Sequence, residues 1–149
     1  YCCYFKRNLE AFDASVMVGN LDHLRAAKAE LLALPKEERD RKADALSLLD
    51  ILVEMSARGI QIVLPDLYAS AADRFLIDEQ GRILPPLSTL PGVSVAQAQQ
   101  ILAARQDGPF ISQEEMVRRK IPKSVVEALR AGGLLAQIPQ SSQISLFDL

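Results

Sequence analysis

The chain has 149 residues, of which 49% are apolar, and its formal net charge is −2. This length allows one ordinary domain, or two small ones that share a surface, with a sizeable buried core. Mixed charge without low-complexity tracts excludes a largely disordered chain, and the weak negative charge excludes a surface that attracts phosphate uniformly. Any nucleic-acid binding must therefore be local, or carried by backbone amides.

The first residues contain the two cysteines of the chain, Cys2 and Cys3, which are too few and too close for a disulfide framework or a zinc site. As ordinary thiols they fit a reducing cytoplasm. No apolar run reaches the roughly 18 residues of a membrane-spanning helix, and no secretion signal is present. We therefore expect a cytoplasmic protein without membrane contact. The aromatic start at Tyr1, without a methionine, is typical of a piece of a longer chain.

Two helices are predicted in the first half of the chain. Asn20 can cap a segment whose apolar residues recur at helical spacing as far as Leu34, and Pro35 ends it. A second helix is expected from about residue 36 to residue 58, with one apolar face and a stop at Gly59. Because the apolar spacing is not a sustained heptad, the pattern favours intramolecular packing over an oligomeric coiled coil.

The sequence period changes after the second helix. Apolar residues alternate from residue 60 to residue 64, and two apolar segments flank a turn at residues 78–81, which predicts a small β-hairpin. Between them we expect a short helical turn in which Asp73 reaches back to the Ser70 amide. The pair Pro85-Pro86 marks a predicted boundary.

Beyond this boundary, three predicted helix starts share one capping pattern, a serine followed three residues later by an acid or an amide. The pairs are Ser94 with Gln97, Ser112 with Glu115 and Ser124 with Glu127. Regular capping of this kind indicates compact helical hairpins, and Gly132-Gly133 ends the last of them. The remaining residues are mostly polar and predict a flexible tail.

The segment Leu90-Pro91-Gly92-Val93-Ser94 and the helix predicted after it resemble a helix-hairpin-helix DNA-binding motif. A glycine lets the backbone approach a ligand closely, and the free amides of the next helix start point at an anion. Ser94 replaces the second glycine of the family pattern. The candidate phosphate-binding residues are Gly92, Val93 and Ser94. The alternative is a capped loop between two core helices.

A second unit of the same kind follows at residues 108–131, with a loop that contains no glycine. Its candidate contacts are therefore charged side chains, which can bind phosphate without reading the base sequence. These candidates are Arg118, Arg119, Lys120 and Lys123. A solvated helix end is the alternative for such a basic cluster. As a tandem, the two units favour a module that binds double-stranded DNA.

The last residues carry the most specific pattern of the chain. A resemblance to the bacterial sliding-clamp-binding motif is carried by Gln143, Ile144, Ser145, Leu146 and Phe147. Leu146 and Phe147 can fill an apolar pocket of the partner, while Gln143 can hydrogen-bond at its rim. The alternative is that the apolar residues fold back on the helical domain. A position near the end of the sequence favours a clamp-binding tether.

Several segments together resemble the PolC-type alpha subunit of bacterial DNA polymerase III over nearly the whole chain. They are residues 1–5 with Phe12-Asp13, 58–68, 75–78 and 84–92, and the match continues to the terminal peptide. The implied fold is mainly α with a small β-hairpin: a helical remnant of a fingers domain, a tandem helix-hairpin-helix domain and a flexible C-terminal tail. The implied ranges are 1–84 for the end of the fingers domain and its connector, 85–139 for the duplex-binding module and 140–149 for the tail.

The resemblance also implies a non-catalytic role. Polymerases of this family carry metal-binding aspartates in a palm domain, and no comparable cluster of acids occurs in this sequence. We therefore expect no cofactor in this chain, with magnesium bound by the palm domain in the rest of the polymerase chain. The expected function is to hold product duplex without sequence specificity and to tether the polymerase to the sliding clamp.

Two alternatives belong to other functional classes. One is a stand-alone helix-hairpin-helix module of a repair or competence protein, which would bind duplex but no clamp. The other is an enzyme, such as a nuclease or lyase that carries this module. Neither a nucleophile paired with a base nor an acid cluster supports the enzyme.

Overall fold

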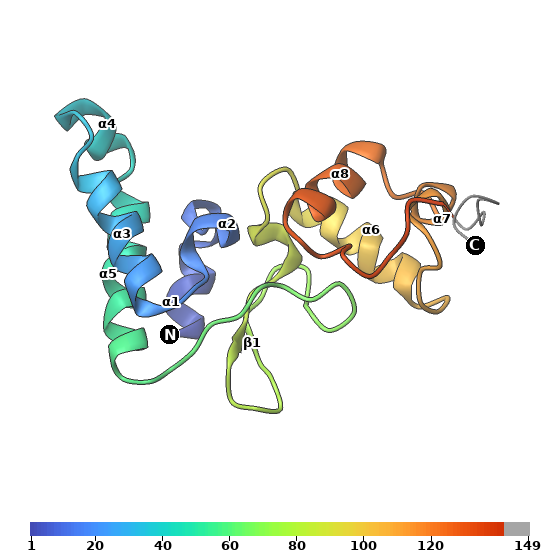
Figure 1. Cartoon of the computed structure of the whole chain (residues 1–149), viewed down its shortest axis with the longest axis horizontal. Coiled ribbons are helices and arrows are strands. Elements are labelled where there is room, and N and C mark those ends of the chain that lie inside the picture. The colour runs from blue at the N-terminus through green and yellow to red at the C-terminus, as the bar shows by residue number, and fades with distance from the viewer. Residues whose placement is uncertain (142–149) are drawn as a thin grey trace, which may run out of the picture.

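The computed structural model describes residues 1–141, which form short and medium helices and one β-hairpin (Figure 1). The expectation of a mainly helical chain with a small hairpin is confirmed. In chain order the elements are α1 (Cys2–Arg7), the 3-10 helix η1 (Leu9–Ala11), α2 (Ala14–Met17), α3 (Leu21–Leu32), α4 (Lys36–Arg41), α5 (Ala43–Ala57), β1 (Leu76–Ile77), β2 (Ile83–Leu84), the 3-10 helix η2 (Leu87–Thr89), α6 (Val95–Arg105), α7 (Gln113–Arg118) and α8 (Lys123–Ala131).

Helices α3 and α5 lie side by side as an arm, with α4 at its far end (Figure 1). Asn20 caps α3 as predicted, because its Oδ1 accepts the His23 amide at 2.8 Å. The apolar face of α5 is buried through Leu48, Leu49, Leu52 and Met55. The single helix expected from residue 36 to residue 58 is wrong, since it is interrupted at Lys42. Residues 36–41 have no apolar face to bury, and α4 contributes no buried residue.

Strands β1 and β2 form the predicted antiparallel hairpin, with Leu76 opposite Leu84. Asp78 closes its turn, because its Oδ1 accepts the backbone amides of Gln80 and Arg82 at 2.9 and 2.8 Å. Its Oδ2 also accepts from Arg82 Nε at 2.8 Å. One carboxylate therefore organises the whole turn.

The helical turn expected at residues 70–73 does not form. The Ser70 amide donates to the Asp66 carbonyl at 3.1 Å, and the Ser70 hydroxyl accepts the Asp66 amide at 2.8 Å. Asp73 instead pairs with Lys6 Nζ at 2.8 Å. The long-range ion pair and the loop between residues 66 and 70 replace the local cap that the sequence suggested.

The described residues bury two hydrophobic clusters. The first joins Phe5, Phe12 and Phe75, whose ring centroids are 5.0 to 5.5 Å apart, to the inner faces of α3 and α5. The second holds the buried residues between 87 and 135, and three residues of the first half contribute to it: Ala14, Leu67 and Ala72. The first half of the chain therefore contributes part of the hydrophobic core of the helical module. Domain boundaries at residues 84 and 139 stay a prediction.

Candidate nucleic-acid interface

Two loops of the helical module share one backbone arrangement. Gly92 and Lys120 have φ values of +87° and +71°, and Lys120 is the one non-glycine residue of the described chain with a positive φ. Each is followed by a buried aliphatic residue, Val93 or Ile121, and two residues later by the helix that the loop introduces. The two units predicted from the sequence therefore contain equivalent loops, although the second loop contains no glycine.

In the first loop, Ser94 forms the predicted capping box with Gln97. The Ser94 hydroxyl accepts the Gln97 amide at 3.1 Å, and Gln97 Oε1 accepts the Ser94 amide at 3.0 Å. This occupies the amide of Ser94. The amides of Gly92, Val95 and Ala96 have no acceptor within residues 1–141, so they are the donors that the loop offers to an anion.

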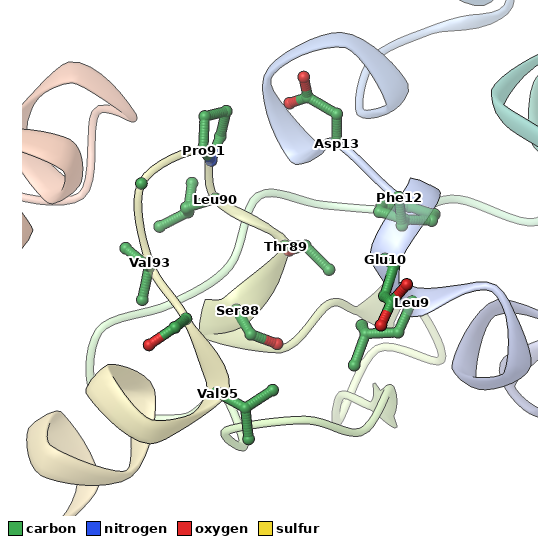
Figure 2. Close-up of a pocket in the computed structure, with 12 residues that line it drawn as sticks. Leu9, Glu10, Phe12, Asp13, Ser88, Thr89, Leu90, Pro91, Val93 and Val95 are labelled. Atoms are coloured by element: carbon green, nitrogen blue, oxygen red, sulfur yellow. The ribbon is translucent and has the colours of Figure 1, made fainter. Parts of the chain in front are cut away.

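A hollow of about 390 Å³ separates the first loop from residues 9–13 (Figure 2). Glu10 and Asp13 lie on the wall opposite the loop, and Ser88 Oγ is buried beside it with no hydrogen-bond partner among residues 1–141. Asp13 is engaged as the cap of α2, since its Oδ1 accepts the Ser15 amide at 2.9 Å. Two carboxylates make this wall unfavourable for an anion, so a phosphate meets the loop more favourably from its solvent side.

The second loop begins where α7 ends. The amides of Lys120 and Ile121 donate to the carbonyls of Val117 and Met116 at 3.0 and 3.1 Å, which is the hydrogen-bond pattern of a Schellman motif. Such a motif needs a left-handed residue after the helix, and here that residue is Lys120. Helix α7 therefore ends as if a glycine stood at this position.

The cap predicted for the last helix is wrong. Helix α8 starts at Lys123, and Pro122 occupies the N-cap position with no side-chain cap. The Pro122 carbonyl accepts the amides of Val125 and Val126 at 3.0 and 3.1 Å, so Ser124 already lies inside the first turn. The Ser112 cap is confirmed, because its hydroxyl accepts the Glu115 amide at 3.1 Å.

The four basic candidates of the second unit fall into two environments. Arg118, Lys120 and Lys123 are exposed, and their side chains form no ion pair or hydrogen bond inside the described part of the chain. Arg119 is partly buried instead. Its guanidinium pairs with Glu115, donates to the carbonyls of Gly108, Pro109 and Ala104 at 2.8, 3.2 and 3.3 Å, and lies 5.0 Å from the centroid of the Phe110 ring.

Further contacts missed from the sequence link this region to the first half of the chain. The Tyr68 hydroxyl accepts the Phe110 amide at 3.1 Å, and the two rings stack. Arg105 donates to the carbonyls of Ser70 and Leu67 at 2.7 and 3.2 Å, and burial lowers the pKa of its guanidinium. Backbone carbonyls leave no signature in a sequence, so only the tertiary fold reveals these ties.

The residues predicted to bind the sliding clamp, from Gln143 to Phe147, lie outside the described residues. Within residues 1–141, no group of three or more histidine, cysteine, aspartate or glutamate side chains could hold a metal ion. None of the described helices is long and apolar enough to span a membrane. Around the two loops, the described residues offer backbone amides and exposed cations.

This chain belongs to the helix-hairpin-helix family, whose motif model matches residues 59–144. Over 99% of its length it is also similar to proteins named DNA polymerase III PolC-type. The identity is 36% to that of Caldanaerobacter subterraneus subsp. tengcongensis, 34% to that of Listeria monocytogenes and 32% to that of Bacillus subtilis. The resemblance to this polymerase is thus confirmed. The chain spans about 10% of the length of each of these relatives.

Proposed function

We propose that this chain is a non-catalytic segment of a PolC-type replicative DNA polymerase in the bacterial cytoplasm. It holds the product duplex without sequence specificity and tethers the polymerase to the sliding clamp. The observation that carries the proposal is the pair of equivalent loops at Gly92 and Lys120, each followed by a helix whose first two amides have no acceptor within residues 1–141. Nucleotidyl transfer, with its magnesium ions, is assigned to the rest of the polymerase chain.

The duplex grip rests on two kinds of donor. In the described part of the chain, the amides of Val95 and Ala96 have no acceptor at the start of α6, where the helix dipole favours an anion. Around the second loop, Arg118, Lys120 and Lys123 add exposed positive charge. Both kinds of contact go to phosphate, which is the same for every base sequence, so binding is salt-sensitive and sequence-independent.

Arg119 has another role in this proposal, although the sequence placed it among the phosphate contacts. Its guanidinium is held by Glu115 and by three backbone carbonyls between residues 104 and 109. These contacts join the end of α6 to the end of α7, and thereby fix the position of the first unit relative to the second. We assign Arg119 to positioning the two loops.

The tether is assigned to the terminal peptide. Leu146 and Phe147 fill an apolar pocket of the clamp, and Gln143 hydrogen-bonds at its rim. A weak peptide contact becomes effective when duplex and clamp are bound together, because the second contact then forms at a high effective concentration, with gains on the order of 100-fold.

Calorimetry of the chain with purified sliding clamp tests the tether. Replacing Leu146 and Phe147 with alanine should abolish binding, whereas Leu149→Ala, an apolar change outside the motif, should leave the affinity unchanged. If the parent chain, the double alanine variant and Leu149→Ala all bind the clamp with equal affinity, the clamp assignment is wrong. Salt-sensitive duplex binding without any clamp binding would then favour the stand-alone DNA-binding module.

A further inference from the structure

The segment that leads to the clamp-binding peptide is fastened to the start of α7. The Gln113 amide donates to the Pro139 carbonyl at 2.9 Å, and the Glu114 amide donates to the Gln140 carbonyl at 3.1 Å. Gln113 Nε2 also donates to the Ile138 carbonyl at 3.3 Å. Three consecutive carbonyls are thus bound to two residues of one helix, which fixes the path of the chain as far as Gln140.

Little chain separates this anchor from the peptide. Only Ser141 and Ser142 lie between Gln140 and Gln143. A fully extended chain spans at most about 3.6 Å per residue, so the Cα atom of Gln143 lies within roughly 11 Å of that of Gln140. By the same limit, the Cα atom of Phe147 lies within roughly 25 Å of it. A bound peptide therefore keeps the start of α7 close to the clamp.

We propose that the helix-hairpin-helix module docks directly on the sliding clamp, through the face at the start of α7 that comprises Ile111, Gln113, Glu114 and Gln140. This inference rests on the proposed function, since it takes the terminal peptide as the clamp ligand. The anchored segment acts as a short, fixed connection, and the clamp thereby sets the position of both duplex-binding loops.

The proposed clamp-facing residues adjoin the second duplex-binding loop. Ile111 is 64% exposed beside the anchor, so its side chain is accessible to a partner. The second loop, with Lys120, follows the opposite end of α7. A six-residue helix is about 9 Å long, and Lys123 lines one hollow with Gln113, Glu114 and Gln140, so the clamp-facing and duplex-facing residues adjoin each other.

Cross-linking tests the proximity. A short photoactivatable cross-linker is attached to a cysteine at Ile111→Cys or, as the matched control, at Leu32→Cys. Leu32 is a 46% exposed aliphatic residue of α3, on the arm that points away from α7 (Figure 1). The parent chain, with Cys2 and Cys3 alone, gives the background. Position 111 should cross-link to the clamp at least tenfold more than position 32, and equal yields would overturn the proposal.

Two variants then test whether the anchor creates this proximity. The first inserts eight glycine and serine residues after Gln140. The second is Gln113→Pro, which removes two donors of the anchor; proline is well tolerated at the first position of a helix, and Ser112 already has the extended backbone that precedes proline. Both changes should lower cross-linking from position 111 several-fold, with the peptide still bound. Unchanged yields in both would contradict the fixed connection.

The proposed function and the docked arrangement are contradicted by different results. If alanine at Leu146 and Phe147 leaves clamp binding intact, the proposed function itself is wrong. If those changes abolish clamp binding while positions 111 and 32 cross-link equally, the tether stands and only the docked arrangement is overturned.

Discussion

Gly92 and Lys120 adopt the same left-handed backbone conformation at equivalent places of two hairpin loops, with φ values of +87° and +71°. A glycine reaches this region freely, whereas an L-residue with a side chain does so at a cost of roughly 1 to 2 kcal/mol. The second loop therefore accepts backbone strain and places a cation where the first loop has bare backbone. Different substitutions at Lys120 can therefore test the backbone strain of the loop and its charge separately.

Replacing Lys120 with glycine should relieve the strain and remove the charge together. We expect the free energy of unfolding to rise by up to about 1 kcal/mol, while duplex affinity falls. Lys120→Ala is the matched control, because it removes the charge but keeps a side chain in the left-handed region. Chemical denaturation and duplex binding of both variants check this; a glycine variant no more stable than the alanine variant would argue against strain at Lys120.

Arg119→Ala should destabilise the chain by roughly 2 kcal/mol, because it removes three hydrogen bonds to carbonyls, the ion pair with Glu115 and the contact with Phe110. Arg118→Ala, next to it but exposed and without a side-chain partner among the described residues, should change stability by less than about 0.5 kcal/mol. Urea unfolding of the two variants gives the comparison. Equal effects would remove the positioning role of Arg119.

The sequence predicted local features well where one residue decides them. Asn20, Ser94 and Ser112 cap helices because a short side-chain acceptor reaches an amide of the next turn in almost any fold. Asp78 and Gly81 likewise mark a turn between two apolar segments. The tandem arrangement was predicted from the resemblance of two successive segments, which begin at Leu90 and at Gly108, to helix-hairpin-helix units.

The failures lie where the residue type alone does not decide the conformation or the contact. Ser124 is a good cap by composition, but Pro122 already starts the helix. Lys120 gives no local sign of a left-handed conformation, since lysine rarely adopts one. Arg119 was grouped with its basic neighbours because its acceptors, the carbonyls of residues 104 to 109, are the same for every amino acid. Only the tertiary fold, which places these carbonyls around the guanidinium, selects it.

The hairpin turn should respond to acid. Hydrogen bonds from the Arg82 backbone and side chain and from the Gln80 amide hold the pKa of Asp78 below its ordinary value. A carboxyl with a lowered pKa in the folded state stabilises the fold above its unfolded pKa and loses this contribution as pH falls through the folded value. Asp78→Asn should therefore reduce the acid sensitivity of unfolding below about pH 4, as measured by denaturation between pH 2 and pH 7. An unchanged profile would show that Asp78 contributes nothing to it.

Glu10 should weaken duplex binding at the first loop, because its carboxylate, which has no ion pair within residues 1–141, lies across the hollow from Pro91 and Val93 (Figure 2). Two charges about 10 Å apart in water interact by roughly 0.4 kcal/mol, which is about twofold in affinity. Glu10→Gln should therefore raise duplex affinity by about twofold. Glu38→Gln, on the exposed and distant α4, makes the same change in net charge and should have less effect. Fluorescence anisotropy with labelled duplex distinguishes them, and an equal rise would indicate net charge alone.

The salt dependence of duplex binding tests the central claim most directly. Alanine at Arg118, Lys120 and Lys123 together should lower the slope of log affinity against log salt concentration by roughly 2 to 3, equally for two duplexes of unrelated sequence. The charge-matched control replaces Lys36, Arg41 and Lys42 of the arm and should leave the slope nearly unchanged. A slope that is the same in the parent and both triple variants, or a strong preference for one duplex sequence, would contradict a sequence-independent grip at these loops.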